Sequence, residues 1–213
     1  MITLFLDTSN IKLIVGIIKD NDCISLISQD NDKNLSSKVL PLIKSMLEDS
    51  NILIDDVKRI IIVNGPGSFT GVRVGVTIAK TFAWAKQIDI IPISSLRVMA
   101  TTEVSTDYIV PLIDARRDCF YAAMYDKKEN NVIDDIYISR SELLKKIEEK
   151  TSLDNVTFVS YDEINDIDII LPNININKIN EYCSKMKPIN PHSVNPNYLK
   201  KVEAEEKLND KRN

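Results

Sequence analysis

Two aspartates, Asp7 and Asp114, each end a short apolar run that predicts a β-strand. Asp7 is followed by Thr8 and Ser9, and Arg116 stands two residues after Asp114. Carboxylates can hold a magnesium ion and a bound phosphate, which is the chemistry of a nucleotide hydrolase or kinase. An aspartate beside small polar residues is also a common turn former, and each motif taken alone favours a turn. All five residues are candidates to face a phosphate group.

A glycine-rich turn, Asn64-Gly65-Pro66-Gly67, is a second candidate for phosphate binding. It follows a run of β-branched residues typical of a buried strand and precedes a long helix that Ser68 or Thr70 can cap. Backbone N–H groups at a helix start favour negative charge, so Gly65, Gly67 and Ser68 could cradle an anion. The P-loop signature is absent, however, and the dinucleotide pattern GxGxxG is matched only with one extra residue. Spacing alone favours a tight strand-to-helix turn.

The helix predicted from about Phe69 to Lys86 carries small residues at every fourth position. That spacing places them close to one face, where another backbone can approach closely. Glycine inside a helix costs roughly 1 kcal/mol against alanine, so two glycines imply a compensating contact. The other positions are apolar nearly all round, so we expect one side on a sheet and another against a second helix, from this chain or a partner.

A second amphipathic helix is predicted from Ser37 to Ser50, with Pro41 early enough for its missing N–H to be tolerated. Its apolar stripe is broader than one sheet contact needs, so this helix is also an interface candidate. The two helices together predict a partner or dimer interface formed by Val39, Leu42, Ile43, Met46, Gly71, Gly75, Ile78, Ala79, Phe82 and Ala83.

Composition describes an ordinary globular protein, with 44% hydrophobic and 27% charged residues and a net charge of -4. Neither half has the excess of lysine and arginine of a nucleic-acid platform, so tight RNA binding by this chain alone is not expected. Three cysteines without CxxC spacing favour reduced thiols and a cytoplasmic location. The single histidine, His192, cannot form a two-histidine metal site. No signal peptide is predicted at the start, and Arg73 and Lys80 argue against a membrane span in the long helix.

The order of predicted elements repeats along the chain. Strand, aspartate, hairpin, helix and strand occur in residues 1–105 and again in residues 106–213, which we interpret as two α/β lobes. In the second half, Ser141 is predicted to cap a helix to Lys150, and a short helix is predicted from Asn180 to Met186. Residues 162–180 alternate isoleucine with asparagine and aspartate, and we assign this biased composition no function. The C-terminal segment is a candidate to pack back on the first lobe.

Two strand–aspartate–hairpin halves resemble the superfamily of actin, sugar kinases and heat-shock ATPases, in which two ribonuclease H-like lobes each contain a mixed sheet flanked by helices. Within it, the chain is similar over nearly its whole length to the bacterial TsaB (YeaZ) family. The segment NGPGSFTGVRVG, from Asn64 to Gly75, is a strong family signature. Three further motifs are weak alone: Leu6–Ser9, Ile113–Arg116 and Pro196–Leu199.

This resemblance implies a non-catalytic subunit of the machinery that makes N6-threonylcarbamoyladenosine in tRNA. In that family TsaD transfers the threonylcarbamoyl group, TsaE supplies ATP hydrolysis, and TsaB binds TsaD through helices of its first lobe. TsaB can also form a homodimer through the same surface. Contact with tRNA is then expected only through the complex. No cofactor is required, and a weak nucleotide site with magnesium is conceivable at the TsaD interface or in the cleft.

The catalytic relatives have features that this sequence lacks. It has no paired helix histidines for a metal, and its five glycines all lie at or before Gly75, so the second lobe has no glycine-rich turn for adenosine. We therefore predict no catalytic residue and no metal site. An independent nucleotide-binding hydrolase or kinase that uses Asp7 and Asp114 is the alternative. A peptidase is disfavoured, since neither a zinc-binding histidine pair nor a Ser–His–Asp set is apparent.

Overall fold

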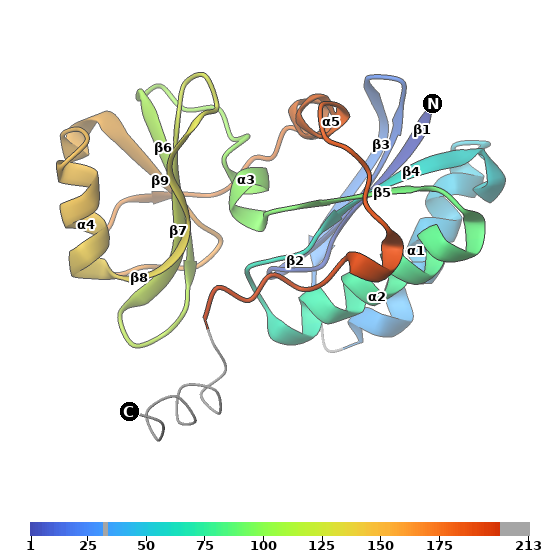
Figure 1. Cartoon of the computed structure of the whole chain (residues 1–213), viewed down its shortest axis with the longest axis horizontal. Helices are drawn as coiled ribbons and strands as arrows, with labels where there is room; N and C mark the ends of the chain where they lie inside the picture. The colour runs from blue at the N-terminus through green and yellow to red at the C-terminus, as the bar shows by residue number, and fades with distance from the viewer. Residues whose placement is uncertain (32–33, 201–213) are drawn as a thin grey trace.

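The computed structural model describes residues 1–31 and 34–200 and arranges them as two α/β lobes side by side (Figure 1). Each lobe contains a five-stranded mixed sheet, in the order β3-β2-β1-β4-β5 in the first and β10-β9-β6-β7-β8 in the second. The predicted fold class, two mixed sheets flanked by helices, is confirmed. Among the described helices, none has the length and hydropathy needed to cross a lipid bilayer.

The first lobe opens with three antiparallel strands, β1 (Ile2–Asp7), β2 (Lys12–Lys19) and β3 (Asp22–Asp30). Helix α1 (Leu35–Asp49) and the 3-10 turn η1 (Ile54–Asp56) lead to β4 (Val57–Val63), which pairs in parallel with β1. Helix α2 (Phe69–Lys86), β5 (Asp89–Ile93) and the short helix α3 (Ser95–Met99) follow.

The second lobe repeats the opening with β6 (Tyr108–Asp114), β7 (Cys119–Asp126) and β8 (Asn131–Ser139). Helix α4 (Arg140–Glu148) and the 3-10 turn η2 (Leu153–Asn155) lead to β9 (Val156–Val159), which pairs in parallel with β6. The short strand β10 (Ile169–Ile170), helix α5 (Ile176–Ser184) and the 3-10 turn η3 (Pro191–Ser193) complete the described chain.

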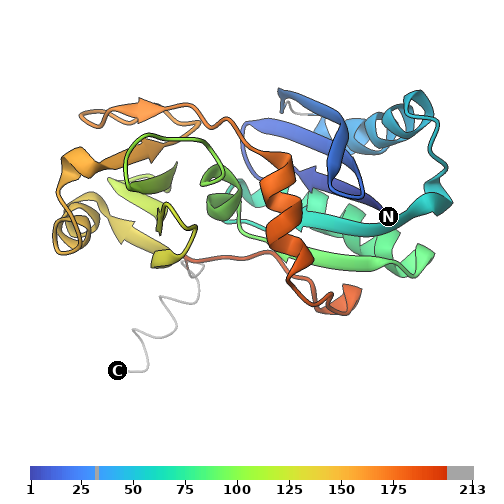
Figure 2. The ribbon, with the colours of Figure 1, turned by 90° about the horizontal axis from the view of Figure 1, so that it is seen from above.

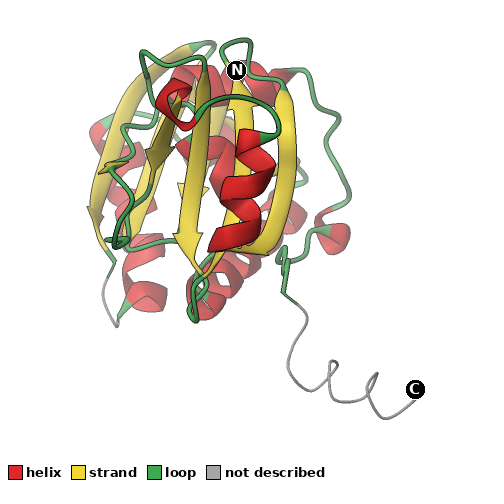
Figure 3. Cartoon of the chain, turned by 90° about the vertical axis from the view of Figure 1, so that its left-hand side faces the viewer, coloured by secondary structure: helices red, strands yellow, loops and turns green. Residues whose placement is uncertain are grey.

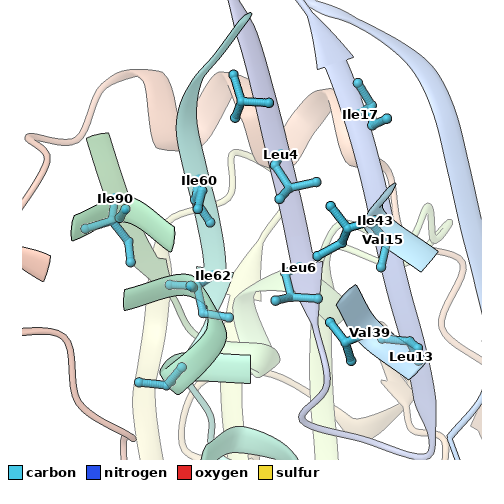
Figure 4. Packing of buried hydrophobic residues seen from close by; sticks show 14 of the residues in the cluster. Leu4, Leu6, Leu13, Val15, Ile17, Val39, Ile43, Ile60, Ile62 and Ile90 are labelled. Carbon is cyan, nitrogen blue, oxygen red and sulfur yellow. The ribbon is translucent and has the colours of Figure 1, made fainter. Parts of the chain in front are cut away.

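The central strands of the first sheet are buried on both faces. Alternate residues of a strand point to opposite faces, so Leu4 and Ile60 pack under α1 and α2 while Phe5 and Ile61 pack under α5. Figure 4 shows the α1 and α2 side of this core, with side chains of four strands and α1 meeting in one layer. This explains the unbroken apolar run of β4.

Helix α5 follows the last strand of the second sheet but packs on the first, as the view from above shows (Figure 2). Its residues Ile176, Ile179 and Cys183 are 5% or less exposed and belong to the same core cluster as Phe5. Residues 189–197, beyond α5, also contact the first lobe: the Ile189 N–H donates to the Ile90 carbonyl at 3.1 Å, and the Asn197 N–H donates to the Asn64 carbonyl at 2.7 Å.

Two predicted helix starts are wrong, because side chains earlier in the sequence cap these helices. Ser139, and not Ser141, caps α4: its hydroxyl accepts a hydrogen bond from the Glu142 N–H. Helix α5 begins four residues earlier than predicted because the Asn175 side chain caps it by accepting from the Lys178 N–H. For α2 the predicted bounds are confirmed, and Ser68 is its cap.

Candidate functional site

An apolar groove lies between α1 and α2 on the outer face of the first lobe. Its volume is about 400 Å³, and nearly all of its lining is aliphatic or aromatic. Leu40, on α1, is 53% exposed at its edge, and Leu53, in the loop before β4, is 72% exposed. Two large apolar side chains that lie at the same groove and are exposed to this extent favour association with another surface. Of the described residues, Lys44 and Glu48 alone are charged in its lining, and they form a 3.7 Å ion pair with each other.

Four of the predicted interface residues line this groove: Ile43, Ile78, Ala79 and Phe82. Ile78 and Phe82 are partly buried, whereas Ala79 is only 1% exposed, at the base of the groove. Of the further predicted residues on α1, Val39 and Met46 belong to the core beneath, and the partly buried Leu42 packs against that core. Leu40 and Leu53, which were not among the predicted interface residues, are more exposed than any of the four.

The glycines of α2 face this chain's own β1 turn. A Cβ atom added to Gly71 would lie 2.1 Å from the Thr8 carbonyl oxygen, and one added to Gly75 would lie 2.2 Å from Thr8 Oγ1. Thr8 Oγ1 also donates to the Gly71 carbonyl at 2.7 Å. Ala83, on the same stripe, is 0% exposed. The close approach that the spacing predicts is therefore intramolecular, which corrects the expectation that Gly71, Gly75 and Ala83 meet a partner.

A second, more polar cleft of about 850 Å³ lies between the lobes. Five of the candidate phosphate-facing residues line it, and they come from both lobes: Ser9, Gly67, Ser68, Asp114 and Arg116. The other three, Asp7, Thr8 and Gly65, are buried and do not line it. The fold thus brings the Asp7 turn and the Asp114 turn to one cleft, but only one of the two aspartates faces it.

Asp7 is an internal anchor of its turn. It is 2% exposed, and its Oδ1 accepts hydrogen bonds from the Ser9 N–H at 2.7 Å and the Ser9 hydroxyl at 2.6 Å. Burial raises the pKa of Asp7 to about 6, against the lowering effect of these two hydrogen bonds. The charge of Asp7 adds to burial in raising the pKa of Tyr161, which does line the cleft. Asp7 is thus a turn former here.

Asp114 and Asp162 form the acidic part of the cleft. Asp162 accepts a hydrogen bond from the Asp114 N–H at 2.9 Å, and Asp114 accepts one from the Arg116 N–H at 2.8 Å. Burial, joined by the charge of Asp114, raises the pKa of Asp162. Within residues 1–31 and 34–200, no group of three or more His, Cys, Asp or Glu side chains could hold a metal ion. Because Asp7 is buried and does not line the cleft, Asp7 and Asp114 do not face a common ion site in this structure.

The glycine-rich turn packs against the β1 turn. The Ser68 N–H donates to the Ser9 carbonyl at 2.7 Å, and a Cβ atom at Gly67 would lie 2.2 Å from the same oxygen. Gly67 has a φ of 154° and Gly65 one of 106°, which suit glycine best. One N–H that could have cradled an anion is therefore already used inside the chain.

Two further clusters were not predicted from the sequence. Arg97, 7% exposed on α3, donates to the Glu129 carbonyl at 2.7 Å and to Asn131 Oδ1 at 2.5 Å, both in the second lobe. At the outer side of α2, Arg73 lies 3.7 Å from the centre of the Phe69 ring and donates to the Tyr198 hydroxyl at 2.7 Å. Each cluster includes a contact between residues distant in sequence, Arg73 with Tyr198 and Arg97 with Glu129, so a local sequence pattern could not predict it.

Comparison with known proteins gives consistent matches. The model of a family described as TsaD, tRNA N6-adenosine threonylcarbamoyltransferase, matches residues 27–164. The tRNA threonylcarbamoyladenosine biosynthesis protein TsaB of Bacillus subtilis is 34% identical over 70% of this chain and 67% of its own length. The protein of the same name from Escherichia coli is 32% identical over 46% of this chain, but the match spans only 43% of that protein.

Solved structures agree on the fold. YeaZ from Pseudomonas aeruginosa superposes with a TM-score of 0.74 over 93% of this chain and 99% of that one, at 18% sequence identity. A second structure from that organism, described as an uncharacterized protein with similarity to peptidase YEAZ, gives 0.75 at 17% identity over the same shares. With two mixed-sheet lobes, the signature turn before α2 and these matches, the chain belongs to the TsaB (YeaZ) family.

Proposed function

We propose that this chain is a non-catalytic scaffold subunit in the biosynthesis of N6-threonylcarbamoyladenosine in tRNA, and that it binds a TsaD-type transferase through the groove between α1 and α2. The role in tRNA modification is supported by membership of the TsaB family, whose members in Bacillus subtilis and Escherichia coli are named as tRNA threonylcarbamoyladenosine biosynthesis proteins. TsaE and tRNA would join through the complex. In the absence of TsaD, a second copy of this chain would occupy the same groove.

The observation that carries the proposal is the exposure of large apolar side chains along the groove. Complete burial of one leucine side chain contributes about 1.5–3 kcal/mol, and Leu40 and Leu53 remain 53% and 72% exposed in the isolated chain. Helix pairs that present such a face commonly pack against a second helix pair. A partner that covers both leucines with its own apolar helices would gain this burial.

The non-catalytic part of the proposal is supported by the cleft. Asp7 is buried and bonded to Ser9, so it is unavailable to a magnesium ion. The cleft still contains Asp114, Arg116 and Asp162, which could contact a nucleotide weakly. The alternative function, a nucleotide-binding hydrolase, can therefore be tested. ATP hydrolysis by the purified chain, lost on Asp114→Ala, would favour that alternative.

The test is the affinity for the cognate TsaD, measured by calorimetry and by light scattering after size-exclusion chromatography. Leu40→Glu places a charge in the apolar groove at an exposed position where the fold should survive. We expect at least about 30-fold weaker binding, the loss of one interface hot spot of about 2 kcal/mol. Ile24→Glu is the matched control, since Ile24 is 44% exposed on β3, outside the groove. Equal affinity for both variants and the natural chain would refute the groove as the interface.

A further inference from the structure

The two lobes share one topology, which allows their surfaces to be compared position by position. β1 and β6 are each antiparallel to the next strand and parallel to a later one, β4 in the first lobe and β9 in the second. β5 and β10 then extend the sheets in parallel beyond β4 and β9. Helix α1 and the turn η1 precede β4 as α4 and η2 precede β9.

One helix of the first lobe has no counterpart in the second. Between β4 and β5 the chain forms α2, which packs on β4 next to α1. Between β9 and β10, residues 160–168 form turns and no helix. Figure 3 looks at the second lobe from this outer side, where α4 lies in front of the sheet. The strip of sheet beside α4, over β9, is the place that α2 occupies in the first lobe.

This strip is a groove of about 830 Å³. The 160–168 segment covers it only in part, with Ile164 and Ile167 packed against the lobe core. Ile170, which lines the groove, leaves an apolar side chain 39% exposed there. The apolar side chains that line the groove are Leu144, Leu153, Val156, Phe158, Ile167 and Ile170.

The rim of the groove is acidic. Asp154, Asp166 and Asp168 line it, are exposed, and make no ion pair with any described residue. Arg140 also lines it, but its guanidinium donates to Asp118 Oδ1 at 2.6 Å and to the Asn165 carbonyl at 2.6 Å. Its charge is balanced by Asp118, so within residues 1–31 and 34–200 the three carboxylates have no ion-pair partner.

We propose that the groove formed by α4, β9, β10 and residues 165–168 is a docking site for an amphipathic helix of another protein, with an apolar face and basic flanks, seated where α2 lies in the first lobe. Shape and charge both specify this occupant. Helix α2 covers the equivalent strip of sheet and carries Arg73, Lys80 and Lys86 but no acidic residue. Lysines or arginines on the flanks of a docked helix would face the three unpaired aspartates, whereas RNA would be repelled.

The proposal does not depend on the α1–α2 groove, which lies on the other lobe, so either can fail alone. The probe is an 18-residue peptide of leucine, alanine and lysine with leucines at helical spacing, added to the ¹⁵N-labelled full chain. Its control is the same peptide with glutamate in place of lysine. Amide chemical-shift changes locate the bound peptide, and fluorescence anisotropy measures its affinity.

We expect the lysine peptide to shift amides of residues 153–158 and 165–170. Asp154→Lys/Asp168→Lys should weaken its binding by about tenfold or more, because interfacial charge pairs become repulsive. The variant Asp22→Lys/Glu149→Lys changes the same charge at exposed positions that do not line the groove and should bind normally. Shifts confined to α1 and α2, equal binding of the glutamate peptide, or equal affinities for the two double variants would each overturn the proposal.

Discussion

The contact between Thr8 and the glycines of α2 can be tested by giving Gly75 a methyl group. In the natural chain the new Cβ atom would lie 2.2 Å from Thr8 Oγ1, although ordinary contacts begin at 3.4 Å. On an open helix, Gly→Ala stabilises by about 1 kcal/mol. Here α2 must shift, or Thr8 must rotate and lose its 2.7 Å hydrogen bond to the Gly71 carbonyl. Overpacking costs about 1–3 kcal/mol and a lost hydrogen bond about 1 kcal/mol, so we expect a net change from near zero to 2 kcal/mol of destabilisation.

The decisive measurement is the double-mutant cycle with Thr8→Ala. That substitution removes Oγ1, and the nearest remaining Thr8 atom is the Cβ atom at 3.4 Å. Gly75→Ala should then stabilise by up to about 1 kcal/mol in the Thr8→Ala background, as on an ordinary helix. The coupling energy between the two substitutions should therefore be about 1–3 kcal/mol. Gly71→Ala is the control, because its clash at 2.1 Å is with the Thr8 backbone oxygen, which Thr8→Ala leaves in place.

Urea unfolding, followed by the fluorescence of the single tryptophan, Trp84, gives the free energy of unfolding for each variant. The reasoning is refuted if Gly75→Ala stabilises the natural chain by the full helix-propensity value. It is also refuted if Thr8→Ala relieves Gly71→Ala as well as Gly75→Ala. Either result would mean that α2 and the β1 turn are not in the contact described.

Three other predictions concern burial and capping. The pKa of Asp7 is raised from 3.8 to about 6 in the folded protein, so the folded state binds more protons than the unfolded state between these values, and stability should fall as pH rises through that window. Asp7→Asn should therefore leave the free energy of unfolding nearly unchanged at pH 4 and raise it by up to about 3 kcal/mol at pH 7. Urea unfolding at both pH values measures this, and an equal effect of the substitution at pH 4 and pH 7 would contradict it. Ser139→Ala should cost about 1 kcal/mol in thermal unfolding through loss of the α4 cap, whereas Ser141→Ala should stay within about 0.5 kcal/mol. Arg97→Ala should cost about 2 kcal/mol and increase cleavage between the lobes in limited proteolysis, because it removes two hydrogen bonds from a charged, buried guanidinium to the second lobe; unchanged cleavage would argue against a linking role.

Much of the local structure could be predicted because it depends on neighbours in sequence. Helix α2 begins after Ser68 because that hydroxyl caps it, and it ends where Gln87 takes up a left-handed conformation. The succession of strands and helices along each lobe follows from apolar runs, hairpin turns and strand-ending aspartates. The strong family signature from Asn64 to Gly75 lies within a strand-to-helix turn, where backbone geometry dictates the residue types.

The partner of each surface was decided by the tertiary structure. Spacing on α2 required a close neighbour, but only the fold showed that Thr8, more than sixty residues earlier, is that neighbour, and that Leu40 and Leu53 are the exposed edge of the groove. Two aspartates at strand ends looked equivalent, yet Asp7 is buried and Asp114 faces the cleft. Likewise, the acidic groove exists because residues 160–168 form no helix over β9. Sequence determines local hydrogen bonding and periodicity, whereas which face is covered depends on contacts between distant segments, and no local pattern encodes those contacts.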